Sequence, residues 1–163
     1  MARINEPASG HGRITSPAGN RYWEYGNPDE LNILKRAMSI IESNVKGMRP
    51  CNDCFKRLPG GRSFDEVWAD NSVWINYESR VDRGWFGVTL GVGGTEVSIS
   101  KLAFKNGLWC VAGTLVHELA HVNGAPINTA DAEQTLLKCG LKNVYDRAII
   151  GLLPSSNPDY LVC

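Results

Sequence analysis

Two periods of hydrophobic positions run along the chain and divide it into helical and extended stretches. Between residues 27 and 47 the apolar positions recur every three or four residues, the spacing of a helix with one buried side: Leu31, Leu34, Met38, Ile41 and Val45. Asn27 provides an N-cap before this stretch, and Gly47 ends it. Ser63 and Glu66 have the spacing of a capping box and predict a second, shorter helix that runs to about residue 69.

An alternating pattern takes over between residues 73 and 100 and predicts β-strands. The three predicted strands lie at residues 73–77, 85–90 and 96–100, where β-branched and aromatic residues alternate with polar ones. Gly91 to Gly94 separates the last two strands. Neither a helix nor a Lys followed by Ser or Thr comes after these glycines, so they indicate a hairpin turn and not a phosphate-binding loop.

Helical periodicity returns in the last third of the chain. We expect helices at residues 107–123, 128–139 and 142–153, the first two ended by Gly124 and Gly140. Because the strands come before these helices, the pattern predicts an α+β fold in which a small sheet of about three strands packs against helices.

Length and composition fit one domain. A chain of 163 residues with 43% hydrophobic residues can bury one core but not two of ordinary size. Residues 27–153 carry the periodic patterns and form the predicted catalytic domain. Residues 1–26 are rich in Gly, Pro, Ser and Asn and have no apolar period, so we expect a flexible lead-in, and residues 154–163 form a predicted C-terminal tail.

Charge and hydropathy exclude several classes of partner. Lys and Arg number 17, as do Asp and Glu, so the chain lacks the basic excess typical of proteins that bind nucleic acid or anionic membranes. No apolar run is long enough to span a bilayer, and residues 1–19 lack the apolar core of a secretory signal. We therefore expect a soluble protein with no nucleic-acid partner, no membrane insertion and no signal peptide.

Five cysteines cannot all pair within one chain: Cys51, Cys54, Cys110, Cys139 and Cys163. Cys51 and Cys54 have the spacing of a redox pair, a tight disulfide or one half of a structural zinc site. No second cysteine pair has matching spacing, so a disulfide or free thiols are favoured over a metal at this position. The sequence leaves the pairing open.

The residues with the clearest chemistry stand together in the helix predicted at residues 107–123. His117 and His121 are four residues apart, so both imidazoles project from one face, one turn from each other, and can reach a single zinc ion (Zn2+). Glu118 is turned by about 100° from His117 around the helix, which suits contact with a water on the metal better than metal binding. The pattern predicts a zinc site with Glu118 as the general base.

The rest of this helix favours a metal site. Its large apolar residues form a stripe opposite His117, whereas the residues on the histidine side are small: Cys110, Gly113 and Thr114. A structural histidine in a core usually stands alone on an apolar face, but two of the three histidines of this chain share one face. Metal binding is therefore favoured over two buried structural histidines.

The segment from His117 to His121 resembles the active-site helix of the zincin metallopeptidases, and the strands before it are similar to the zincin arrangement. The resemblance implies a minimal zincin-like fold and a zinc-dependent hydrolase that cleaves peptide bonds. It also implies that zinc is held by His117 and His121, that Glu118 is the base, and that the strand at residues 96–100 pairs with an extended peptide or protein substrate.

A catalytic zinc site needs a third protein ligand. Metzincins place a Gly and then a His or Asp after the second histidine; Gly124 fits this pattern, but Ile127 stands where the ligand should be. Gluzincin-like enzymes take a carboxylate from the next helix, where this chain offers Asp131 and Glu133. We favour Glu133 and keep Asp131 as the alternative, because Asp131 is also placed to cap the helix.

The resemblance leaves the substrate and the remaining catalytic group open. Tyr145 is a candidate oxyanion donor, its other role being that of a core aromatic residue. From Thr114 to Gly140 the chain is similar to metallopeptidase domains of bacterial toxins and secreted effectors, which implies delivery as an effector and an immunity or carrier protein as partner. Two other functions stay open: a hydrolase of peptidoglycan or another amide with the same zinc site, and a non-enzymatic binding module stabilised by zinc.

Overall fold

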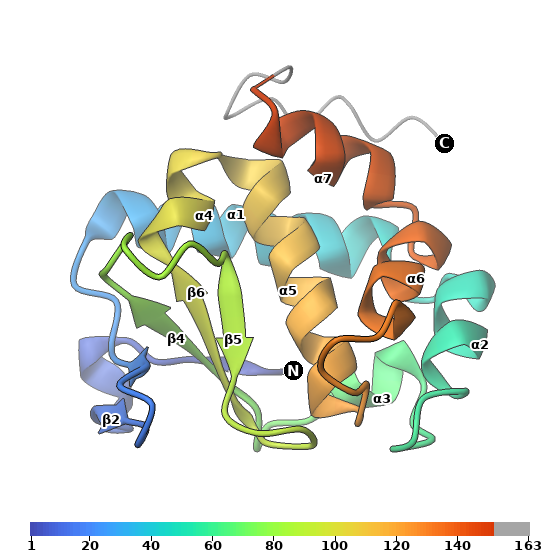
Figure 1. Ribbon diagram of the computed structural model, residues 1–163, viewed down its shortest axis with the longest axis horizontal. Coiled ribbons are helices and arrows are strands. Elements are labelled where there is room, and N and C mark those ends of the chain that lie inside the picture. Colours follow the sequence, from blue (N-terminus) through green and yellow to red (C-terminus); the bar gives the residue numbers. More distant parts are fainter. Residues whose placement is uncertain (152–163) are drawn as a thin grey trace.

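A small mixed β-sheet lies against a central helix in the computed structural model, which describes residues 1–151 (Figure 1). The sheet has the spatial order β1 (Arg3–Ile4), β4 (Trp74–Glu78), β6 (Glu96–Ser100), β5 (Gly87–Thr89). The first three strands are parallel, and β5 is antiparallel to β6. The sheet and the surrounding helices confirm the predicted α+β class, with one strand more than the predicted three.

Seven α-helices occur within residues 1–151: α1 (Pro28–Asn44), α2 (Arg49–Phe55), α3 (Phe64–Ala69), α4 (Lys101–Lys105), α5 (Leu108–Val122), α6 (Asp131–Lys138) and α7 (Lys142–Ile149). A 3-10 turn (Pro7–Ser9) and a small hairpin of β2 (Ile14–Thr15) and β3 (Arg21–Tyr22) complete the elements. All helices except α2 and α4 are predicted by the sequence. The predicted tail at residues 154–163 lies outside the described residues.

The start signals of two helices are formed as the sequence predicts. The Asn27 side chain accepts hydrogen bonds from the backbone N–H groups of Asp29 and Glu30 at the start of α1. Ser63 and Glu66 form a reciprocal capping box at the start of α3. Each cap satisfies backbone donors that a helix end leaves unpaired, which fixes where the helix begins.

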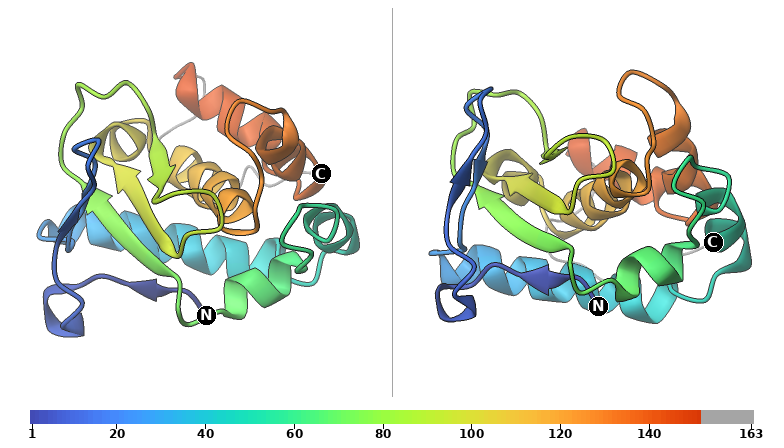
Figure 2. Two further views of the ribbon diagram at one scale, coloured as in Figure 1. Left: turned by 60° about the horizontal axis from the view of Figure 1, so that its bottom comes forward. Right: turned by 90° about the horizontal axis from the view of Figure 1, so that it is seen from below.

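Helix α5 is the centre of the fold. It packs against α1, α6 and α7 and against the β5–β6 side of the sheet, as Figures 1 and 2 show. Of its 15 residues, all but His117 and His121 are buried. The small residues on the histidine side do not line an open cleft, because Gly113 lies under the Tyr145 ring of α7. The helix therefore reaches solvent only at its two histidines.

Residues 1–26, which the sequence predicts as a flexible lead-in, pack against the sheet: β1 lies at its outer edge, and β3 contacts β4 and β6 (Figure 2). Strand β1 pairs in parallel with β4, and Asn5 donates a hydrogen bond of 2.9 Å to Asn76 Oδ1, with both side chains fully buried. The Tyr25 hydroxyl donates to the backbone carbonyl of Asn76. These residues thus belong to the packed domain, contrary to the predicted boundary at residue 27.

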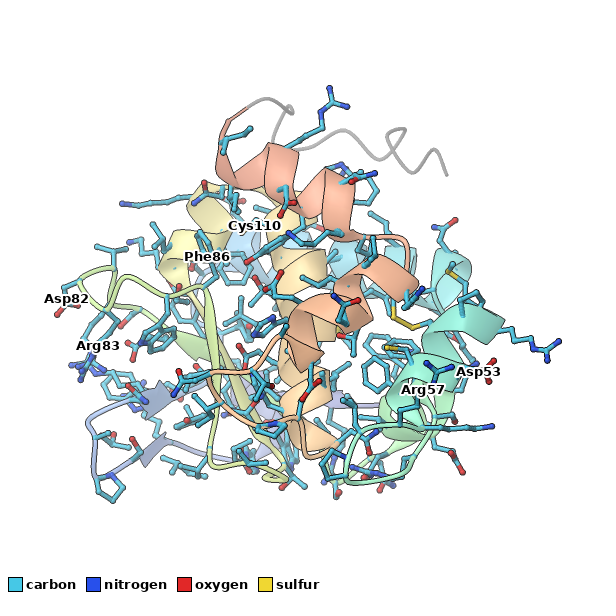
Figure 3. All side chains as sticks on the ribbon, turned by 45° about the vertical axis from the view of Figure 1, so that its right-hand side comes forward. Asp53, Arg57, Asp82, Arg83, Phe86 and Cys110 are labelled. Atoms are coloured by element: carbon cyan, nitrogen blue, oxygen red, sulfur yellow. A yellow bond between two sulfur atoms is a disulfide. The ribbon has the colours of Figure 1, made fainter. Side chains whose placement is uncertain are left out.

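A disulfide joins Cys51 of α2 to Cys139 at the end of α6, so Cys51 does not pair with Cys54 (the disulfide is drawn as a yellow bond in Figure 3). Cys54 and the buried Cys110 are free thiols, and Cys163 lies outside the described residues. A cross-link between residues 88 positions apart restricts the unfolded chain and contributes roughly 4–5 kcal/mol to stability. It fastens α6 to the body of the domain.

No helix within residues 1–151 is both long and apolar enough to cross a membrane.

Candidate metal centre

The two histidines of α5 turn the same ring atoms toward each other. His117 Nε2 and His121 Nε2 lie 3.2 Å apart, with the ring planes at 69°. The helix begins at Leu108 after Gly107, whose φ of +92° favours glycine. Two helical turns of buried residues then bring the pair to the solvent-exposed side, so the local sequence and the packing of α5 together set this geometry.

The chain turn after α5 fixes the tautomer of His121. Its Nδ1 lies 2.8 Å from the backbone carbonyl oxygen of Ala125. A carbonyl can only accept a hydrogen bond, so Nδ1 carries the proton and Nε2 keeps its lone pair. Ala125 is held in turn by a hydrogen bond from its N–H to the carbonyl of Ala120. His121 is therefore oriented as a metal-ligating histidine is, with its second nitrogen on a backbone carbonyl.

His117 faces a carboxylate with its other ring nitrogen. Its Nδ1 lies 3.2 Å from Glu133 Oε1, at ion-pair distance but outside hydrogen-bond geometry. Burial lowers the pKa of His117, the neighbouring His121 lowers it further, and the Glu133 carboxylate opposes both effects. The carboxylate favours a proton on Nδ1, which leaves the His117 Nε2 lone pair directed at that of His121.

This arrangement fits a zinc ion. Two nitrogen lone pairs that face each other repel unless a cation or a proton lies between them. Two imidazole ligands at tetrahedral angles around zinc have their nitrogens roughly 3.3 Å apart, and the Nε2 atoms here are 3.2 Å apart. The side chains are already close to the separation that a shared zinc ion requires.

The structure does not gather a third ligand at this point. Within residues 1–151, no cluster of three or more His, Cys, Asp or Glu side chains surrounds one position. Glu133 reaches His117 from the Nδ1 side, away from the paired Nε2 atoms, and its other oxygen lies 3.5 Å from Lys142 Nζ. Asp131 accepts a hydrogen bond from the Thr129 hydroxyl beside the start of α6. Of the two predicted candidates, the structure brings Glu133 to His117 and leaves Asp131 in the first turn of α6, bonded to Thr129.

Substitutions of these two carboxylates separate their roles. We expect Glu133→Ala to weaken zinc binding by at least about 10–100-fold, the range for losing a carboxylate that orients a ligating histidine. Asp131→Ala is expected to leave zinc affinity unchanged. Competition with a chromophoric chelator measures both affinities.

A third variant distinguishes an orienting carboxylate from a ligand. In Glu133→Gln the amide oxygen offers His117 Nδ1 an acceptor in the same place as the carboxylate, but it is a much weaker metal ligand. If Glu133→Gln binds zinc about as tightly as the unsubstituted protein, Glu133 orients His117 and does not bind the metal. A loss of zinc affinity as large as in Glu133→Ala would make Glu133 the third ligand. A loss in Asp131→Ala alone would overturn the preference for Glu133.

Glu118 is held beside the histidines by strand β5. The side chain is 4% exposed, and its Oε2 accepts a hydrogen bond of 2.8 Å from the Thr89 hydroxyl. Burial raises the pKa of Glu118 to about 7, against the opposing effect of the Thr89 bond. Gly87 permits this approach, because a Cβ atom there would lie 2.9 Å from Glu118 Oε1. The sequence analysis missed both β5 residues, although a glycine inside a strand pattern often marks such a close approach.

Beside these groups lies a cavity of about 180 Å3, which we name the α5 cavity. Its lining residues come from β5 and the turn after it, from α5, and from the segment after α5: Gly87, Val88, Thr89, Gly91, Val92, His117, Glu118, His121 and Ile127. A larger groove of about 710 Å3 lies between α1 and β1. That groove contains none of the predicted site residues, whereas the smaller cavity is lined by His117, Glu118 and His121.

The strand that borders the cavity is β5 and not the predicted strand at residues 96–100. Strand β6 is an interior strand, paired with β4 on one side and with β5 on the other, and cannot accept an added strand. The Phe86 carbonyl and the Leu90 N–H bond to β6. Because backbone groups alternate in direction along a strand, those of Gly87 and Thr89 point to the free edge of β5.

Tyr145 lies at the far side of the histidine face. Its ring packs over Gly113 and edge-on against Phe86, with Cys110 close by (Figure 3 labels Phe86 and Cys110). Burial raises the pKa of its hydroxyl. These contacts are those of a core aromatic residue, the alternative role considered for it, and its role as oxyanion donor stays a prediction.

Comparisons with known proteins do not assign the chain to a family. No protein-family model matches the chain, and neither the curated proteins nor the solved structures give a significant match.

Proposed function

We propose that the protein is a zinc-dependent hydrolase that cleaves peptide bonds, with His117 and His121 as zinc ligands and Glu118 as general base. The observation that carries the proposal is the pair of Nε2 atoms 3.2 Å apart, beside a buried carboxylate and under a free strand edge. Glu133 is the proposed third ligand. The minimal zincin-like fold and the metallopeptidase resemblance belong to the same proposal.

The residues have separable tasks in this reaction. Bound zinc supplies a Lewis acid, which polarises the substrate carbonyl and acidifies a water. Thr89 occupies Oε2 of Glu118, which leaves Oε1 to take a proton from the attacking water. Glu118 then delivers that proton to the amine that leaves. The Thr89 bond keeps the carboxylate in one orientation during both transfers.

The edge of β5 supports a peptide as the substrate. An extended peptide can pair with the outward N–H and C=O groups of Gly87 and Thr89 and so lie along the α5 cavity. This replaces the predicted pairing with residues 96–100. A glycan strand has no regular array of amide groups to match such an edge, which favours peptide hydrolysis over peptidoglycan hydrolysis with the same zinc site.

The setting of a secreted bacterial effector, with an immunity or carrier protein as partner, stays part of the proposal. Its support is the Cys51–Cys139 disulfide, because such cross-links persist in oxidising environments. A non-enzymatic module stabilised by zinc is the alternative. Such a module has no need of a carboxylate buried beside the metal, where burial disfavours the charged form.

Metal analysis combined with a hydrolysis assay tests the proposal. We expect the gently purified protein to contain about one zinc per chain and to cleave a library of internally quenched peptides. A chelator should abolish cleavage, and added zinc should restore it. Protein without zinc would contradict the metal site, cleavage of purified peptidoglycan alone would select the rival substrate, and zinc without either activity would select the binding module.

A further inference from the structure

Two exposed aliphatic side chains stand at the mouth of the α5 cavity. Val92 is 48% exposed and Ile127 is 65% exposed, and both line the cavity. They come from separate loops, Val92 from the turn after β5 and Ile127 from the segment between α5 and α6. We call this pair the aliphatic rim.

Backbone hydrogen bonds hold both loops to the end of α5, close to His121. The Gly93 N–H donates to the His121 carbonyl at 2.8 Å, which ties the Val92 turn to the helix. On the other side, the Ala125 N–H donates to the Ala120 carbonyl, and Ile127 follows two residues later. The rim is thus fixed relative to the proposed zinc ligands. A substrate side chain that binds at the rim therefore lies next to the bond that the site would cleave.

The cavity offers little to a charged side chain. Among the described residues that line it there is no lysine or arginine, and the carboxylate present is that of Glu118. Lys142, which approaches Glu133 from α7, is already bonded to Asp146 at 2.6 Å. An acidic group in the cavity would find no basic side chain of the lining to pair with. One that reached the zinc would compete there with the reacting water, and a basic group would compete for the general base.

An aliphatic group, in contrast, matches the lining. Val92 and Ile127 present apolar surface, and the removal of that surface from water by a bound side chain stabilises the complex. A cavity of about 180 Å3 accommodates one side chain of moderate size. Exposed apolar residues gathered at a cavity are typical of binding sites.

We propose that the aliphatic rim and the α5 cavity form the specificity site for the substrate, and that they accept an uncharged aliphatic side chain next to the cleaved bond. This inference rests on the proposed function and adds its substrate class. It predicts discrimination against substrates that carry a carboxylate beside the cleaved amide.

Quenched peptides that differ in one residue beside the cleavage site test the inference. For zinc-loaded protein, we expect kcat/KM for a leucine peptide to exceed that for a glutamate peptide by at least about tenfold. Ile127→Lys and Val92→Lys should each shrink this ratio and raise cleavage of the glutamate peptide. Leu137→Lys is the matched control, because Leu137 is 52% exposed and lies on α6 outside the cavity lining. It should leave the ratio unchanged.

The outcomes separate this inference from the proposed function. Cleavage of all peptides at equal rates, or equal ratios in the rim variants and the control, would overturn the inference and leave the peptidase intact. Absence of cleavage by zinc-loaded protein would refute the peptidase. In that case the affinities of leucine hydroxamate and glutamate hydroxamate, which bind through the metal, are measured by calorimetry, so that the site is tested without catalysis. Tighter binding of leucine hydroxamate, lost in Ile127→Lys, supports the site, and equal affinities overturn it.

Discussion

Glu118→Gln is expected to lower kcat for peptide hydrolysis by about 10²–10⁴-fold, the contribution of a positioned general base, while the zinc content stays at that of the unsubstituted protein. The amide has the shape of the carboxylate and can accept the Thr89 hydrogen bond that Glu118 Oε2 accepts. It cannot take a proton from water. Catalysis is therefore removed without a change in the packing of α5, and steady-state kinetics with metal analysis on the same sample measures both effects.

Glu96→Gln provides the control for this change. Glu96 is also a carboxylate with defined hydrogen bonds, from Asn76 and with His11, but it lies at the start of β6 and does not line the α5 cavity. Its substitution should leave kcat within a few-fold. Hydrolysis retained in Glu118→Gln would refute the mechanism, and loss of zinc from that variant would make Glu118 a ligand instead of the base.

The sequence predicts those parts of the fold that short-range chemistry determines. The Asn27 cap and the capping box of Ser63 and Glu66 are local hydrogen-bond patterns, and both are formed. The strands after Val73 follow from alternation alone. The order of the strands in the sheet does not follow from alternation, because alternation does not tell whether β5 or β6 pairs with β4. In the structure β6 pairs with β4 and β5 lies at the edge.

The N-terminal segment shows why composition misleads here. Glycine and proline are frequent between residues 1 and 26, but Asn5 satisfies its amide through Asn76, and Tyr25 through a backbone carbonyl of β4. Such partners are more than 50 residues away in the chain. A pattern read along the sequence has no access to them, so a segment with no apolar period appears unstructured even where it is packed.

The disulfide has the same explanation. The close spacing of Cys51 and Cys54 draws attention to that pair, whereas the observed partner, Cys139, is brought in by the packing of α6 against α2. Spacing alone cannot select among the partners of five cysteines. The same holds for the candidate site. The three α5 residues are predictable because they form a local motif, whereas the contact of Glu133 with His117 depends on the packing of α6 against α5.

His117→Ala and His121→Ala are each expected to weaken zinc binding by more than about 100-fold, beyond the 10–100-fold range for the loss of a carboxylate that only orients a ligating histidine. Each imidazole supplies one of the two Nε2 atoms that lie 3.2 Å apart. Removal of either ring leaves one histidine nitrogen, too few protein ligands for a stable zinc site. Chelator competition and metal analysis measure the loss.

His11→Ala is the matched control, because His11 is the remaining histidine of the chain and bonds to Glu96 while its ring stacks on Trp74. It should keep its zinc. Zinc retained after either α5 substitution would place the metal elsewhere. If His117→Ala and Glu133→Ala together lose no more affinity than His117→Ala alone, Glu133 acts through the imidazole, since a carboxylate that only orients a ring contributes nothing once the ring is gone. A further loss in the double variant would mean that Glu133 itself binds the metal.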